Sequence, residues 1–133
     1  MRLAYSRLIS AVRYHQYTQA RFMAEQVELK PVENLIKKKL QNAFQPSVLQ
    51  VMNESYMHSV PKGSETHFKV VIVADKFDSL PLIKRHRLVN ETLKEELDTG
   101  VHALSIVAKT PAQWEDTGGK VSRSPPCQGG AGL

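Results

Sequence analysis

The hydrophobic and polar positions first follow a helical spacing between Pro31 and Phe44. Apolar residues recur there at steps of three and four, and Lys39 is the one polar residue on the same stripe. Pro31 suits the first position of a helix, where its missing N–H costs nothing, and Pro46 ends the element. The pattern therefore predicts an amphipathic helix over residues 31–44.

Three later stretches have the composition of strands. Residues 48–53 alternate weakly, residues 67–75 form an unbroken valine-rich run, and residues 103–109 form a third apolar stretch. The unbroken character of the middle run predicts burial on both faces of the sheet. Residues 54–65, which contain a proline and a glycine, are predicted to form the loop between the first two strands.

Residues 79–97 form the second helical region. Pro81 suits a helix entry, a break near Lys84 would divide the region into two helices, and Gly100 is placed to end it. One stripe, at steps of four, three, four and four, comprises Leu82, His86, Val89, Leu93 and Leu97. The adjacent Glu95 and Glu96 are predicted to lie on the solvated face.

A capping motif opens the last predicted element. Thr110, Pro111 and Gln113 combine an N-cap, a first-position proline and a capping-box glutamine, which predicts a short helix ending near residues 114–116. The expected order is α-β-β-α-α-β-α, an α/β (α+β) fold with a three-stranded mixed sheet. The short loop makes the first two strands antiparallel, and the helical crossover makes the second and third parallel.

This topology has a consequence for two distant histidines. The loop that carries His58 and the start of the third strand, next to His102, fall at the same end of the sheet. The sequence therefore predicts that His58 and His102 are neighbours in space. From spacing alone, loop histidines more often face solvent than bind a metal, and both interpretations stay open at this point.

The positive charge is concentrated at the start of the chain. The net charge is +5; the first 24 residues contribute +4 and no Asp or Glu, which leaves +1 for the remainder. An arginine-rich, acid-free, moderately apolar segment is typical of mitochondrial import, and the alternative is a disordered basic arm. The nearly neutral remainder gives little support to a protein that binds a phosphate backbone.

These features predict three parts and a location in the mitochondrial matrix. We expect a transit segment over residues 1–24, a globular domain over 31–116 and a flexible C-terminal tail over 117–133. Cys127, the one cysteine, lies in the tail between proline and glycine residues. It allows no intramolecular disulfide and no cysteine metal cage, and we interpret it as an inert exposed thiol.

The sequence predicts no enzyme, because it contains no GxGxxG, P-loop, HExxH or nucleophile-elbow motif. Three of the five histidines are interpreted without a ligand role. His15 lies in the transit segment, His86 lies on an apolar stripe, and His67 begins the buried strand. His58 and His102 remain as the candidates for cofactor and metal binding.

Several ordered motifs resemble the BolA family over roughly residues 31–127. Ala74 stands where the family commonly has a serine, a change that we expect to be minor. The end of the domain, KTPAQW at 109–114, and the SPPC tail resemble a mitochondrial branch of the family. The other motifs are NES at 53–55 with His58, GSETHF at 63–68, KVVIV at 69–73, Phe77, RHRLV at 85–89 and VHAL at 101–104.

The resemblance implies a fold similar to class II KH domains and a partnership with a monothiol glutaredoxin. In such pairs a [2Fe–2S] cluster is shared: the glutaredoxin and glutathione supply sulfur, and the BolA protein supplies His102 and His58. The protein alone would be a monomer without a cluster. Neutral imidazole is the ligating form, so sharing is expected to weaken below a pH of about 6.5.

Two other functions compete with this adaptor role. A KH-like nucleic-acid-binding module is suggested by the topology and by Arg85 and Arg87, but residues 79–98 contain no glycine and so no GxxG clamp. A thiol redox enzyme using Cys127 is disfavoured because the sequence has no resolving cysteine. No membrane association is expected.

Overall fold

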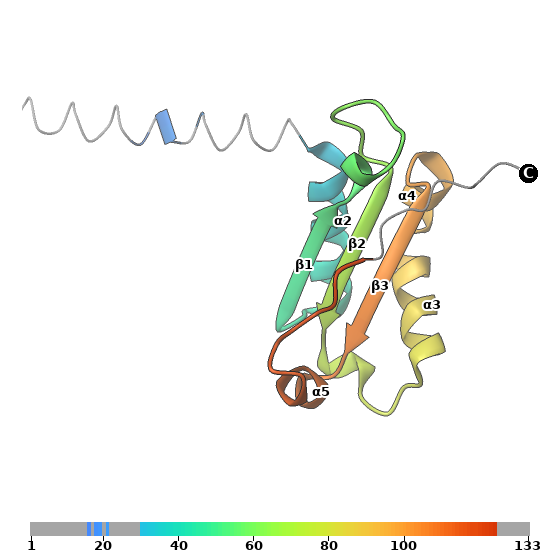
Figure 1. Cartoon of the computed structure of the whole chain (residues 1–133). Coiled ribbons are helices and arrows are strands. Elements are labelled where there is room, and N and C mark those ends of the chain that lie inside the picture. Colours follow the sequence, from blue (N-terminus) through green and yellow to red (C-terminus); the bar gives the residue numbers. More distant parts are fainter. Residues whose placement is uncertain (1–15, 17, 20, 22–29, 125–133) are drawn as a thin grey trace, which may run out of the picture. The chain divides into compact units, whose positions relative to one another are not determined.

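The computed structural model describes residues 16, 18, 19, 21 and 30–124. The predicted order of helices and strands is confirmed (Figure 1). The elements are α2 (Pro31–Phe44), β1 (Val48–Asn53), η1 (Ser55–Met57), β2 (His67–Val73), η2 (Asp75–Phe77), α3 (Leu82–Thr92), α4 (Lys94–Thr99), β3 (Ala103–Lys109) and α5 (Pro111–Asp116). Most of the predicted transit segment, and Cys127, lie outside the described residues. No helix within the described part is long and apolar enough to span a bilayer.

The sheet has the order β1-β2-β3 and is mixed, as predicted. β1 pairs antiparallel with β2, and β2 pairs parallel with β3. The register sets Val51 opposite Val70 in the first pair, and His67 opposite Ala103 in the second. The parallel pairing places the first residues of β2 and β3 side by side at one end of the sheet.

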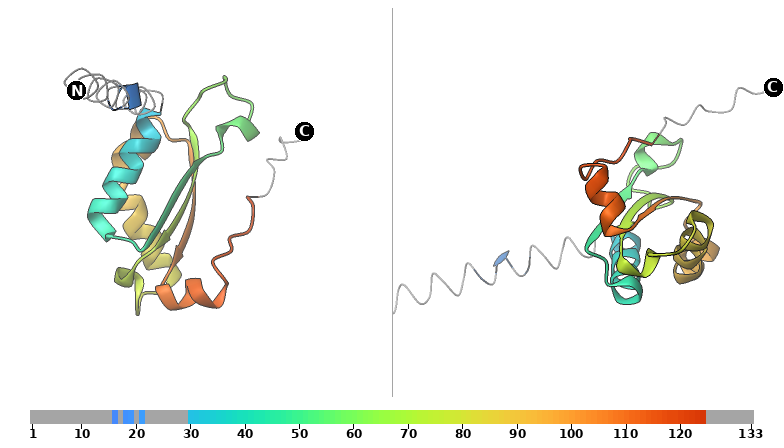
Figure 2. Two further views of the ribbon diagram at one scale, coloured as in Figure 1. Left: turned by 90° about the vertical axis from the view of Figure 1, so that its left-hand side faces the viewer. Right: turned by 90° about the horizontal axis from the view of Figure 1, so that it is seen from below.

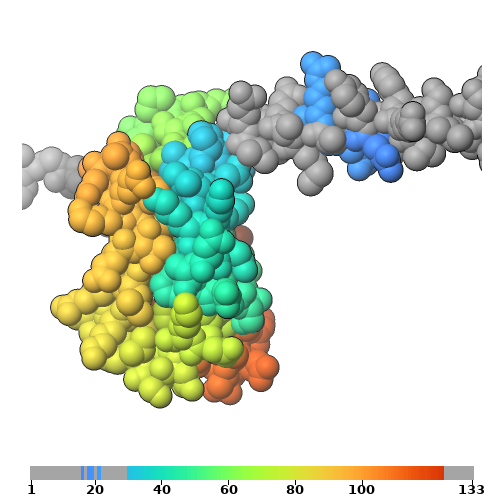
Figure 3. Space-filling view, turned by 180° about the vertical axis from the view of Figure 1, so that it is seen from behind, coloured from blue at the N-terminus to red at the C-terminus, as the bar shows by residue number. Residues whose placement is uncertain are grey.

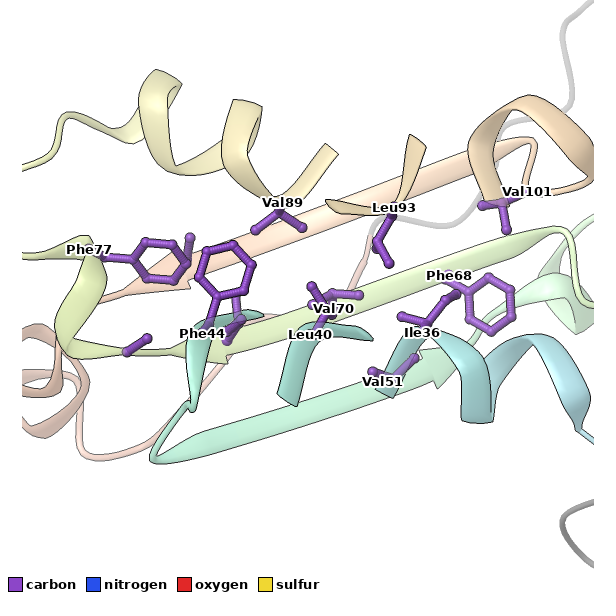
Figure 4. Packing of buried hydrophobic residues seen from close by; sticks show 13 residues of the cluster. Ile36, Leu40, Phe44, Val51, Phe68, Val70, Phe77, Val89, Leu93 and Val101 are labelled. Atoms are coloured by element: carbon purple, nitrogen blue, oxygen red, sulfur yellow. The ribbon is translucent and has the colours of Figure 1, made fainter. Parts of the chain in front are cut away.

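The helices α2, α3 and α4 cover one face of the sheet (Figure 2). Alternate residues of β2, Phe68, Val70 and Ile72, point to this face and are at most 2% exposed. They pack with Ile36 and Leu40 of α2 and with residues of the other helices (Figure 4). The period-two alternation of the strands and the helical stripe of α2 thus meet in a single hydrophobic core.

The opposite face of β2 is covered by α5 and the segment that follows it (Figures 1 and 2). Val71 and Val73 on this face are fully buried, which confirms the prediction that the strand is buried on both faces. The Lys69 ammonium donates to the carbonyl of Ser122. The described part of the predicted tail, residues 117–124, therefore lies against the sheet, and its flexibility stays a prediction.

The predicted break near Lys84 is wrong. α3 is continuous from Leu82 to Thr92, and the interruption falls at Leu93, whose φ of −104° and ψ of 17° separate α3 from α4. Leu93 is 1% exposed, so the interruption lies on the core side. On either side of it, α3 buries Val89 and α4 buries Glu96.

The predicted apolar stripe of residues 79–97 is also partly wrong. Leu82 is 61% exposed, whereas Arg85 is buried at 6%. The Arg85 guanidinium donates to the carbonyls of Leu80 (2.8 Å) and Ala108 (3.3 Å) and to the side chain of Gln113 (2.7 Å). A buried cation is tolerated when its donors are hydrogen-bonded, and two of these acceptors, Ala108 and Gln113, belong to a distant part of the sequence.

Glu96 does not lie on a solvated face, contrary to the prediction. Its residue is 4% exposed, and its carboxylate lies 2.6 Å from the ammonium of Lys39. Lys39 also binds Glu95 at 2.7 Å and so joins α2 to α4, which lie side by side (Figure 3). Hydrogen bonds to Glu95 and Glu96 raise the pKa of Lys39, and the bond from Lys39 lowers the pKa of Glu95. Lys39 therefore lies on the apolar stripe of α2 because its ammonium pairs with two carboxylates of α4.

Replacement of Lys39 by methionine is expected to lower the melting temperature at pH 7. The buried Glu96 carboxylate would lose its counter-ion, and an unpaired buried charge is strongly destabilising. Lys38→Met is the matched control, because Lys38 is an exposed lysine on the same helix. Equal melting temperatures for the two variants would show that the Glu96 pair does not stabilise the fold.

Candidate functional site

Three histidines meet at the end of the sheet where β2 and β3 begin. The ring of His58, from the β1–β2 connection, stacks on His67 with centroids 3.8 Å apart and planes inclined by 19°. The ring of His102 lies 5.7 Å from that of His67, at 52°. We call His58, His67 and His102 the histidine edge. The structure thus brings both predicted site residues to one end of the sheet, against a third histidine.

The backbone holds His102 firmly beside the sheet. Its N–H donates to the carbonyl of Thr66 at 2.7 Å, and the N–H of Ala103 donates to the same oxygen at 3.1 Å. Thr66 precedes β2 and Ala103 opens β3, so the parallel pairing itself fixes this position. The His102 residue is exposed, and its imidazole is therefore available to an incoming group.

The connection that carries His58 is tied to the strands by a buried serine and a half-buried asparagine. The Ser55 hydroxyl, in a residue 3% exposed, accepts from the N–H groups of Thr66 (3.0 Å) and His67 (3.1 Å). The His58 N–H donates to the Ser55 carbonyl at 3.1 Å, and the Asn53 amide donates to the carbonyl of Ser64 at 2.9 Å. His58 is half-buried and sits on one end of this hydrogen-bonded turn.

His67 is the residue of the edge that sequence reasoning missed. Its place at the opening of a buried strand predicts a structural residue, and its half-buried ring lies against both other histidines. Its Nδ1 lies 2.8 Å from the Thr66 hydroxyl. Burial first, and then the charges of His58 and His102, lower the pKa of His67. Its place at the start of β2, beside the start of β3, was the signal that could have identified it.

The lowered pKa of His67 predicts a loss of stability in mild acid. The unfolded chain binds a proton at His67 near its ordinary pKa of about 6.5, whereas the folded chain resists protonation. Stability is therefore full above pH 6.5 and falls as the pH drops below it. Urea unfolding midpoints between pH 7.5 and 5 should decline less steeply in His67→Gln than in the His86→Gln control. Parallel declines would contradict the prediction.

The histidine edge offers imidazole donors but no complete metal site. Within residues 30–124, and at 16, 18, 19 and 21, no three His, Cys, Asp or Glu side chains are arranged to hold a metal ion. The stacked rings of His58 and His67 lie in nearly parallel planes, which does not suit joint coordination of one ion. Imidazole nevertheless suits iron, and the edge carries imidazoles near solvent. A cluster completed by sulfur from a partner is compatible with this set.

The other candidate residues are not brought to this edge. His86 is half-buried on α3 and makes none of the ring contacts that join His58, His67 and His102. Arg85 is buried by the contacts described above, so it presents no guanidinium to solvent. Cys127 lies outside the described residues.

Comparison with known proteins gives consistent matches. A family model described as BolA-like protein matches residues 40–113. BolA-like protein 1 of Mus musculus is 52% identical over 101 residues, which cover 76% of this chain and 73% of the relative. The DNA-binding transcriptional regulator BolA of Escherichia coli is 47% identical over 102 residues, which cover 77% of this chain and 97% of the relative. The solution structure of BolA1 from Mus musculus matches with a TM-score of 0.65 and 52% identity, over 74% of this chain and 80% of that one.

Proposed function

Since the chain belongs to the BolA family of regulatory and adaptor proteins, we propose that it binds a monothiol glutaredoxin and shares a [2Fe–2S] cluster with it. His102 and His58 would be its ligands to one iron, and the partner and glutathione would supply the sulfur. The protein would act in the assembly, transfer or regulation of iron–sulfur clusters in mitochondria. It is not proposed as an enzyme.

The observation that carries the proposal is the convergence of His58, His67 and His102 at one solvent-facing sheet end. A pair of imidazoles without thiolates is an incomplete site, which gives a reason for a second protein. The exposure of His102 supports its role as a ligand, because a partner protein can reach its imidazole. The arginine-rich segment at residues 1–24 supports the mitochondrial location.

The residues of the edge would have different tasks. His102 presents its imidazole from a backbone position that the sheet determines through Thr66. His58 offers its imidazole from a turn, and the stacked His67 ring limits how that side chain can move. When bound, a cluster with histidine ligands supplies one-electron chemistry at a higher potential than one held by thiolates alone.

The direct test is reconstitution with a monothiol glutaredoxin, glutathione, iron and sulfide under anaerobic conditions. We expect a heterodimer by light scattering and a visible circular dichroism spectrum different from that of the cluster-loaded glutaredoxin alone. A spectrum identical to that of the glutaredoxin homodimer, with no heterodimer, would refute the proposal. Pull-down from mitochondria, with detection of glutaredoxin and iron, extends the test to the cell.

The second candidate function is a nucleic-acid-binding regulatory module. It is favoured by one observation, the 47% identity to a bacterial protein named as a DNA-binding transcriptional regulator. The burial of Arg85 removes one of the two arginines that suggested such a role, and Arg87 remains exposed on α3. Titration with duplex DNA at several salt concentrations tests this function. If the protein contacts phosphates, its affinity for DNA falls steeply as the salt concentration rises, and no binding near 100 mM salt excludes the function.

A further inference from the structure

A cavity of about 520 Å³ lies between β1, the β1–β2 connection and the segment after α5. Figure 1 shows that segment crossing the sheet on the face opposite to the helices. Typical small-molecule sites have volumes of roughly 300–1,000 Å³, so the cavity is large enough for a small organic ligand. It is separate from the hydrophobic core and from the ring contacts of the histidine edge.

The wall of the cavity contains a buried lysine whose ammonium has few partners. Lys69 is 5% exposed, and a lysine ammonium has three N–H donors. Among the described residues, the carbonyl of Ser122 is its one hydrogen-bond acceptor, and it forms no ion pair. A buried cation without a counter-ion is costly, and an anion in the cavity would remove that cost.

The charges around the cavity favour an anion. Lys69 and Arg123 are positive, and Glu54 is the one carboxylate among the lining residues, which leaves a net charge of +1. Glu54 already accepts a hydrogen bond from the Ser124 hydroxyl at 2.9 Å. It is not within ion-pair distance of Lys69, so that ammonium remains free to pair with a ligand.

Part of the remaining wall is apolar, beside the polar side chains of Gln50, Ser122 and Ser124. Met52 and Met57 line the cavity together with Tyr56 and Val121. Methionine side chains are flexible and polarizable, and they adjust to ligands of irregular shape. From these observations we propose that the cavity binds a small organic anion, a carboxylate on a short unbranched apolar chain. Lys69 pairs with the carboxylate, and the two methionines contact the chain.

The test uses octanoate as the probe and 1-octanol as its uncharged match. The full chain is labelled with carbon-13 at its methionine methyl groups, and the Met52 and Met57 signals are followed during titration. We expect saturable shifts with octanoate and binding of octanol that is weaker by roughly ten- to hundredfold, the usual contribution of a hydrogen-bonded charge. Equal binding of the two, or no saturable shift with octanoate, would overturn the proposal.

Two variants test whether the charge of Lys69 is needed for octanoate binding. Lys69→Gln keeps a donor for the Ser122 carbonyl but removes the charge, and it should weaken octanoate binding by more than about tenfold while octanol binding stays unchanged. Lys62→Gln, at an exposed lysine of the β1–β2 connection, should bind octanoate like the wild type. Undiminished octanoate binding by a folded Lys69→Gln would also overturn the proposal. If that variant does not fold, the comparison of octanoate with octanol on the wild type decides.

Discussion

Replacement of His102 by alanine is expected to abolish the altered visible spectrum of the complex with glutaredoxin. His102 is the exposed imidazole of the histidine edge, and the N–H bond to Thr66 fixes its position. Loss of even a supporting group around a metal ligand costs roughly 10- to 100-fold in affinity, so loss of the ligand itself should cost at least as much. Absorption and circular dichroism of the reconstituted mixture measure the effect.

The matched control for this variant is His86→Ala, which removes a histidine outside the edge. The fold of His102→Ala should be intact, with a free energy of unfolding within about 0.5 kcal/mol of the wild type, because the residue is exposed. A mixture with His102→Ala that keeps the wild-type spectrum would refute His102 as a ligand. An effect of equal size in His86→Ala would point to a general loss of structure.

Replacement of Arg85 by alanine is expected to reduce the free energy of unfolding by about 3 kcal/mol. The variant removes charged donors to Leu80, Ala108 and Gln113 and leaves these acceptors without their partner. A small domain has a net stability of only about 5–15 kcal/mol, so the change would be conspicuous. Urea unfolding followed by circular dichroism measures it.

Arg87→Ala is the control for Arg85→Ala, because Arg87 is an exposed arginine on the same helix. Its stability should differ from that of the wild type by no more than about 0.5 kcal/mol. Similar stabilities for the two variants would mean that the buried guanidinium contributes little. The pair also separates folding from nucleic-acid binding, since only Arg87 is exposed to a phosphate.

The fold was predictable where local pattern and topology agree. The unbroken run of β2 and the capping box at Thr110 identify their elements, and the short loop and the helical crossover are sufficient for the strand directions in the sheet. The structure confirms the capping box, with bonds of 3.3 Å and 3.2 Å between Thr110 and Gln113. Arg85 and Glu96 were misassigned because each is buried only by virtue of a partner that is distant in sequence. Hydrophobic periodicity contains no information about such partners.

The candidate site was predictable in position but not in composition. Strand directions alone were enough to bring His58 and His102 to one sheet end. The stacking of His58 on His67 depends on the turn built around Ser55. The Ser55 hydroxyl accepts two N–H hydrogen bonds there, and no sequence pattern predicts them. The cavity beside Lys69 was missed for a similar reason, since its outer wall is a segment without regular structure.

That segment also bears on how fragments of the chain should behave after proteolysis. Residues 117–124 contain no helix or strand, yet they cross the sheet on the face opposite the helices, where the carbonyl of Ser122 accepts a hydrogen bond from Lys69 of β2. A proteolytic cut just after Asp116 would leave the helices and strands of residues 31–116 in place but would uncover part of this face of the middle strand. Exposed apolar strand surface promotes self-association, so a fragment ending at Asp116 should aggregate where one ending at Ser124 does not.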